Sequence, residues 1–177
     1  MPFAEVRDTH TYYELHGEGP QLLYVSGSNG PMWSQALDPL RTQFTVLSYE
    51  KRGLGRTVVP DTEWTMADFA DDAVTLLDVV GWEHCLIIGS SFGGMIAQEI
   101  AIRHPERVRR LVLCCTSPGG DFASYPLHEL LDLEPKERTS RLIAISDIRK
   151  DTAWQAIHPR EYAAIAENRM RVTDQPN

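Results

Sequence analysis

The most constraining feature of the sequence is a short apolar run that leads into a turn of small residues and then into a helix. Residues 85–88 are apolar, and Gly89-Ser90-Ser91-Phe92-Gly93 follows them with the pattern G-x-S-x-G. Apolar side chains then recur at helical spacing from Met95 onward. A strand that turns sharply into a helix at such a pattern holds the central serine in strained geometry with its Oγ exposed. The pattern therefore predicts Ser91 as a nucleophile.

The same turn predicts a place where negative charge is stabilised. The amide of Phe92 would lie at a helix N-terminus, where N–H groups lack intrahelical acceptors and the helix dipole favours anions. We therefore expect Phe92 to supply half of an oxyanion hole. The alternative is a glycine-rich turn without chemistry, and ordinary glycine and serine usage gives the bare pattern in roughly one chain in twenty of this length.

Composition excludes several classes of partner. The chain has 177 residues, 42% of them hydrophobic, and carries 17 basic against 25 acidic residues for a net charge of -8. An acidic chain without a basic run argues against nucleic acid and anionic membranes as partners. No apolar stretch approaches the roughly 18 residues of a membrane span and no signal peptide is recognisable, so we expect a cytoplasmic protein. No metal-ligand spacing occurs, so we expect no metal and no cofactor.

The three cysteines, Cys85, Cys114 and Cys115, lie in apolar runs. An odd number of cysteines in such runs predicts buried, reduced thiols.

Strand-like and helix-like segments alternate along residues 3–118. Residues 3–17 are typical of an antiparallel hairpin, and buried strands are expected at 22–25, 44–49, 85–88 and 110–115. Amphipathic helices are expected at 32–42, 66–80 and 91–104. This alternation predicts the α/β class, with a mostly parallel sheet and helices on both faces. Functional groups in such sheets gather at the carboxyl ends of the strands, where the loop 26–30 and Ser91 both fall.

A charged, glycine-punctuated loop spans residues 50–57. It lacks the spacings of phosphate-binding loops. We therefore expect Arg52 and Arg56 to hold the loop by hydrogen bonds to backbone or acidic groups.

Three features follow one another along the chain: the glycine loop after an early strand, the loop Arg52-Gly53-Leu54-Gly55, and the G-x-S-x-G turn. With these features in this order, the chain resembles the α/β-hydrolase superfamily. The resemblance covers about residues 3–118 and implies a serine hydrolase acting on esters, lactones, amides or activated C–C bonds. Ser26-Gly27 stands where many members have His-Gly. The resemblance therefore implies the amide of Ser28 as the second oxyanion donor.

The resemblance also divides the chain into two regions. Residues 1–120 correspond to the N-terminal part of the hydrolase core. Residues 121–177 are rich in Leu, Glu and Arg and resemble the helical cap that roofs the pocket in this superfamily, with Pro159 in the first turn of a helix.

A serine hydroxyl needs a base to take its proton and a carboxylate to orient that base. In this superfamily both groups follow the nucleophile, on loops after further strands, and no strand-like run follows Cys115. We therefore expect an incomplete hydrolase core. Within the chain, Asp121 is the candidate acid and His158 or His128 the candidate base, and each has the alternative of being a solvated hinge or surface residue.

Two functions follow from these observations. The first is acyl transfer from a small ester or lactone to water, with Ser91 as nucleophile. The second is a catalytically incomplete remnant that binds a ligand or associates with itself. The strand at Leu111–Cys115 would be a bare apolar sheet edge, which favours pairing with a second copy.

Overall fold

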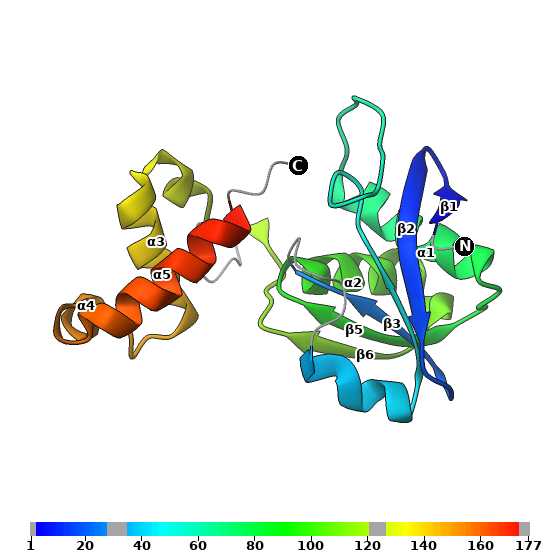
Figure 1. Ribbon diagram of the computed structural model, residues 1–177. Helices are drawn as coiled ribbons and strands as arrows, with labels where there is room; N and C mark the ends of the chain where they lie inside the picture. Colours follow the sequence, from blue (N-terminus) through cyan, green and yellow to red (C-terminus); the bar gives the residue numbers. More distant parts are fainter. Residues whose placement is uncertain (1–2, 28–34, 121–126, 174–177) are drawn as a thin grey trace. The chain divides into compact units, whose positions relative to one another are not determined.

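The computed structural model describes residues 3–27, 35–120 and 127–173, apart from the side chains of 35–37, 127, 128, 131 and 168–173. The chain divides into two compact units, Met1–Phe122 and Ala123–Pro176. The first contains the sheet and the second is built from helices (Figure 1).

A six-stranded sheet organises the first unit. Its strands lie in the order β1 (Phe3–Val6), β2 (Thr9–His16), β4 (Thr45–Tyr49), β3 (Gln21–Val25), β5 (Cys85–Ser90) and β6 (Val108–Cys114). The β1–β2 hairpin is antiparallel, β2 runs antiparallel to β4, and the last four strands are parallel to one another. The expected α/β class with a mostly parallel sheet is confirmed.

Helices cover both faces of this sheet. Helices α1 (Met66–Val79) and α2 (Phe92–Arg103) pack together on one face, and η1 (Gln35–Thr42) lies on the other (Figure 1). The described part of the helix expected at 32–42 is a 3₁₀-helix with Pro39 inside it. A proline lacks the N–H that a regular α-helix needs in its interior, so Pro39 disfavours an α-helix over this segment. A short 3₁₀ turn, η2 (Pro105–Arg107), follows α2.

The core fills the space between the central strands and the pair α1 and α2. Leu23, Val25 and Leu47 are fully buried, and Ile87 is 1% exposed. Strands β3 and β5 pair in parallel with Val25 opposite Gly89. The carboxyl ends of these two central strands therefore lie side by side, and the loops that leave them meet at one edge of the sheet.

Strand β6 is the edge strand, as expected from the lack of a strand-like run after Cys115, but the burial expected for residues 110–115 and for two cysteines is wrong. Among the described strands it pairs with β5 alone. Val112 is 50% and Leu113 43% exposed, so the strand expected to be buried is largely open. Cys114 and Cys115 are exposed, and only Cys85 is buried as predicted. The reason is the strand's position, because an edge strand has no neighbour on its outer side.

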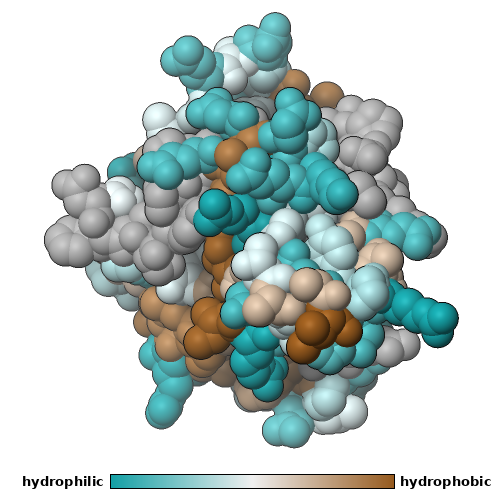
Figure 2. Space-filling view, turned by 90° about the vertical axis from the view of Figure 1, so that its left-hand side faces the viewer, coloured by the Kyte–Doolittle hydropathy of each residue, from teal (hydrophilic) through white to brown (hydrophobic). Residues whose placement is uncertain are grey.

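The second unit consists of η4 (Leu127–Asp132), α3 (Pro135–Ser146), α4 (Thr152–Ile157) and α5 (Pro159–Thr173), which begins at the proline expected to start a helix. Leu130, Ile143 and Ala166 form its small core. Figure 2 shows mostly hydrophilic residues with hydrophobic ones in patches between them. Within the described parts of the chain, no helix is long and apolar enough to cross a lipid bilayer.

Candidate functional site

Ser91 lies at the junction of β5 and α2 with a backbone that few residues adopt. Its φ is 54° and its ψ is -122°, and the residue is exposed. A non-glycine residue with positive φ costs of order 1–3 kcal/mol and persists only where its surroundings hold it. Here the Ser91 N–H donates to the carbonyl of Cys114 at 2.9 Å, and the Thr116 hydroxyl donates to the Ser91 carbonyl at 2.8 Å. The loop after β6 therefore fixes the turn that displays the Ser91 side chain.

Glycines surround this turn because no larger residue fits. A Cβ on Gly89 would lie 2.6 Å from Cβ of Ala97, and one on Gly94 would lie 2.5 Å from Cβ of Thr116. A Cβ on Gly93 would overlap the carbonyl oxygens of Val25 and Ser26. The glycines of the motif thus serve close packing between α2, β3 and the loop after β6.

The backbone around Ser91 offers at least one donor for an anion. Phe92 is the first residue of α2, so its N–H has no acceptor within the helix. Gly27, two residues after β3, faces the serine: a Cβ there would lie 2.5 Å from Ser91 Cβ and 3.2 Å from Ser91 Oγ. Ser28, the expected second donor, lies outside the described residues.

The loop after β4 is held by ion pairs, as predicted for its two arginines. Arg52 is 4% exposed, and its guanidinium donates twice to the Asp72 carboxylate, each time at 2.7 Å, and once to Asp8 at 2.9 Å. These hydrogen bonds raise the pKa of Arg52 above its usual value. Arg56 pairs with Glu50 through its guanidinium and its backbone N–H. Both arginines therefore secure the loop.

Lys51, between these two pairs, was not singled out by the sequence. It is 2% exposed, and its Nζ donates to the Ser26 carbonyl at 2.8 Å and to the Ser26 hydroxyl at 3.1 Å. Burial lowers the pKa of Lys51 to about 8. The sequence feature that could have identified Lys51 is its position, two residues after the buried strand β4 and at the carboxyl edge of the sheet.

Three of the four histidines of the first unit pair with carboxylates. His104, at the C-terminus of α2, contacts Asp71 at 2.8 Å. His10 pairs with Glu5 and His16 with Glu14 on the N-terminal hairpin. Among the described residues, no histidine side chain is hydrogen-bonded to Ser91.

Of the candidate acid and bases, the structure describes His158 alone. Asp121 lies outside the described residues, as does the side chain of His128. His158 caps α4, its Nδ1 lies 3.0 Å from the Trp154 carbonyl, and its ring stacks on Trp154 with centroids 4.7 Å apart. Since a carbonyl can only accept, Nδ1 carries the proton and Nε2 is left as an acceptor when the ring is neutral.

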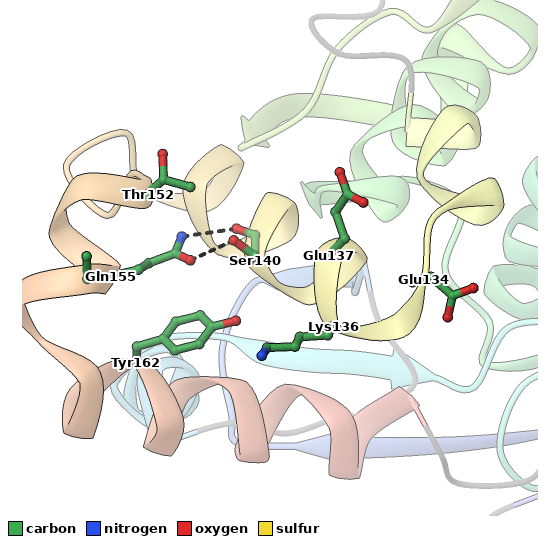
Figure 3. A pocket seen from close by; sticks show the side chains of 8 residues that line it. Glu134, Lys136, Glu137, Ser140, Thr152, Gln155 and Tyr162 are labelled. Atoms are coloured by element: carbon green, nitrogen blue, oxygen red, sulfur yellow. Dashed lines mark hydrogen bonds between the residues drawn. The ribbon is translucent and has the colours of Figure 1, made fainter.

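A pocket with a volume of about 520 Å³ lies in the helical unit (Figure 3). Gln155 and Ser140 meet at its wall through a hydrogen bond of 2.6 Å, with Lys136 and Tyr162 beside them. No residue of the sheet unit lines it. The pocket is shallow. Among the described residues that line it, no nucleophile lies beside a histidine that could act as its base. No group of three or more His, Cys, Asp or Glu side chains in the described parts is placed to hold a metal.

Comparisons with known proteins point to one family. Residues 15–140 match the family described as the alpha/beta hydrolase fold. The chain is 37% identical to the 2-hydroxymuconate semialdehyde hydrolase of Pseudomonas sp. strain CF600 over 119 residues, which are 67% of this chain and 39% of that protein.

Solved structures agree. A carboxylesterase structure from Nitrososphaera gargenis is 32% identical with a TM-score of 0.63, covering 82% of this chain and 54% of that one. The enol-lactonase of Burkholderia xenovorans LB400 shares the fold at 23% identity and a TM-score of 0.66, with 94% of this chain and 66% of that one covered. The chain spans between 36% and 43% of the length of the curated relatives that it matches.

Proposed function

Because the chain belongs to the α/β-hydrolase family, we propose that it carries the nucleophile of a serine hydrolase that transfers an acyl group from a small ester or lactone to water. The observation that supports this most is the exposed Ser91 at φ 54° between β5 and α2. Names of relatives include a carboxylesterase and an enol-lactonase, which suggests this substrate class.

In the proposed reaction, Ser91 Oγ attacks the acyl carbon while a histidine takes its proton. The carbonyl oxygen becomes an oxyanion, held by the Phe92 amide and by the Ser28 amide as second donor. Collapse of this intermediate breaks the bond to the leaving alcohol, which receives the proton from the histidine. Water, activated by the same base, then attacks the acyl-serine and regenerates Ser91.

The base and acid come either from His158 or His128 with Asp121, or from groups outside this chain. His158 suits the role chemically, since its Nδ1 faces the Trp154 carbonyl and its Nε2 is free to accept a proton in the neutral ring. The helical region 121–177 would then act as the cap over the substrate.

The test is labelling with a fluorophosphonate probe, located by peptide mass spectrometry. We expect modification of Ser91 in the wild type and none in Ser91→Ala. His158→Ala should lower the labelling rate at least tenfold if His158 is the base, and His128→Ala serves as its matched comparison. A folded wild type that leaves Ser91 unlabelled would contradict the hydrolase proposal for this chain.

A second function, self-association through β6, has its own support. The outer edge of this strand is open among the described residues, and Val112 and Leu113 are 50% and 43% exposed. Unpaired apolar edges favour pairing with another strand. Light scattering should then find a dimer that Val112→Lys dissociates. Ile102→Lys, on the 75% exposed Ile102 of α2, should leave it intact. A monodisperse wild-type monomer would refute this function.

A further inference from the structure

Lys51 is a buried cation without an acidic partner in the described part of the chain. Its Nζ has two hydrogen-bond acceptors, the carbonyl and hydroxyl oxygens of Ser26. The carboxylates that hold the neighbouring arginines of this loop are engaged with them, Glu50 with Arg56 and Asp72 with Arg52. Burying an ammonium without a counter-ion is unfavourable. Because burial of this ammonium is unfavourable, its presence here points to a role for its contacts with Ser26.

The peptide that Lys51 binds lies against the nucleophile. Ser26 is followed by Gly27, whose hypothetical Cβ would lie 2.5 Å from Ser91 Cβ. The Ser26 carbonyl also packs on Gly93 in the first turn of α2, since a Cβ on Gly93 would overlap it. The carbonyl that accepts the Lys51 hydrogen bond is thus in contact with the turn that carries Ser91. A small rotation of the Ser26–Gly27 peptide would either press on Ser91 or open a gap beside it.

We propose that Lys51 is a positioning residue that holds the Ser26–Gly27 peptide against the Ser91 turn and keeps a positive charge beside it. The positional part of this inference depends on the contacts alone. The catalytic part, in which a fixed peptide and a nearby cation favour negative charge developing at the acyl group, rests on the proposed role of Ser91.

The backbone amide of Gly27 reports the contact directly. The Ser26 carbonyl and the Gly27 N–H belong to one peptide group, so a charged hydrogen bond to the carbonyl polarises the N–H. In the ¹⁵N-labelled full chain, we expect the Gly27 amide resonance to move between pH 7 and 9.5, as Lys51 loses its proton. A wild-type Gly27 resonance that does not titrate in this range would overturn the proposal.

Lys51→Met is the matched control, because methionine keeps an unbranched side chain of similar length and removes the amine. The Gly27 resonance should then stay fixed, and titration that persists in this variant would also overturn the proposal. Lys51→Arg retains the charge and should likewise abolish the titration. If Lys51→Met fails to fold, the wild-type titration still decides.

The catalytic part is tested by the rate of fluorophosphonate labelling at Ser91. Lys51→Met should slow it about tenfold at pH 7, whereas Lys51→Arg should stay within about threefold of the wild type. A Lys51→Met variant that labels at the wild-type rate would overturn the catalytic part. A folded wild type that does not label at all would defeat the proposed hydrolase function, while the Gly27 resonance would still decide whether Lys51 positions the peptide.

Discussion

Replacing Arg52 by methionine tests how the loop after β4 is anchored. The Arg52 side chain is 2% exposed and makes three charge-assisted hydrogen bonds, two to Asp72 and one to Asp8. Arg52→Met would leave the Asp72 carboxylate, 5% exposed, with Arg7 as its remaining partner at 3.3 Å. Removing one member of a buried ion pair costs about 3–5 kcal/mol. Because Arg7 stays, we expect a loss near the lower end, about 3 kcal/mol in the free energy of unfolding.

Urea unfolding followed by circular dichroism measures this loss, and Arg103→Met is its matched control. Arg103 pairs with Asp71, the neighbouring aspartate on α1, but is 41% exposed with a contact of 3.4 Å. Exposed pairs contribute about 0–1 kcal/mol, so the control should change little. With a slope of about 2 kcal/mol per molar urea, Arg52→Met should lower the midpoint by about 1.5 M. A loss below about 1 kcal/mol, or one equal to the control, would refute the argument.

Three further predictions concern the site, the buried lysine and the thiols. Gly27→Ala should slow labelling of Ser91 at least tenfold, because its Cβ would lie 2.5 Å from Ser91 Cβ. Gly81→Ala, just after α1, is the control: its φ of 73° strains the substitution, but a Cβ there meets no atom within 4 Å, so the folded variant should label at the wild-type rate. Burial lowers the pKa of Lys51 from 10.5 to about 8, so between pH 8 and 9 the unfolded chain holds a proton that the native chain releases. Relative to Lys51→Met, the wild-type free energy of unfolding should therefore rise by about 1 kcal/mol over this range in urea titrations, and a flat difference would count against the burial of the amine. Iodoacetamide should alkylate Cys114 and Cys115 in the native chain but Cys85 only after unfolding, since burial raises the pKa of Cys85 to about 11; equal rates by mass spectrometry would contradict this.

The strand, turn and helix around Ser91 were predictable because their signal is local. An apolar run, a set of small residues and a helical period are contiguous in the sequence, and the structure forms β5 and α2 there. The anchoring role of Arg52 and Arg56 was also predictable from a charged loop without phosphate-binding spacing. The partner of Arg52, Asp72, was not predictable, because it lies on helix α1, 20 residues further along the chain.

The resemblance predicted the open edge at β6, but the exposure of Cys114 and Cys115 and the burial of Lys51 depend on strand order, which the local pattern does not contain. Cys114 and Cys115 lie in an apolar run that is typical of a buried strand, but β6 occupies the edge of the sheet. Lys51 stands in a charged loop that is typical of a solvated surface, and only the parallel pairing of β4 with β3 brings Ser26 over its amine. The roles of Ser91, Phe92, Ser28, Asp121, His128 and His158 remain predictions for the labelling experiments.

The position of β3 between β4 and β5 has a consequence for how the chain folds. Leu22 pairs with Leu86, so the central ladder closes only after the whole intervening segment, β4 and α1 included, has been brought into place. In long-range parallel pairing of this kind, closing the loop costs chain entropy before the stabilising contacts form, so folding is slow. The positive φ of Ser91 is held by contacts with Cys114 and Thr116 on the far side of that ladder. The serine therefore acquires its strained geometry when β6 pairs with β5, rather than by growth of the local helix alone.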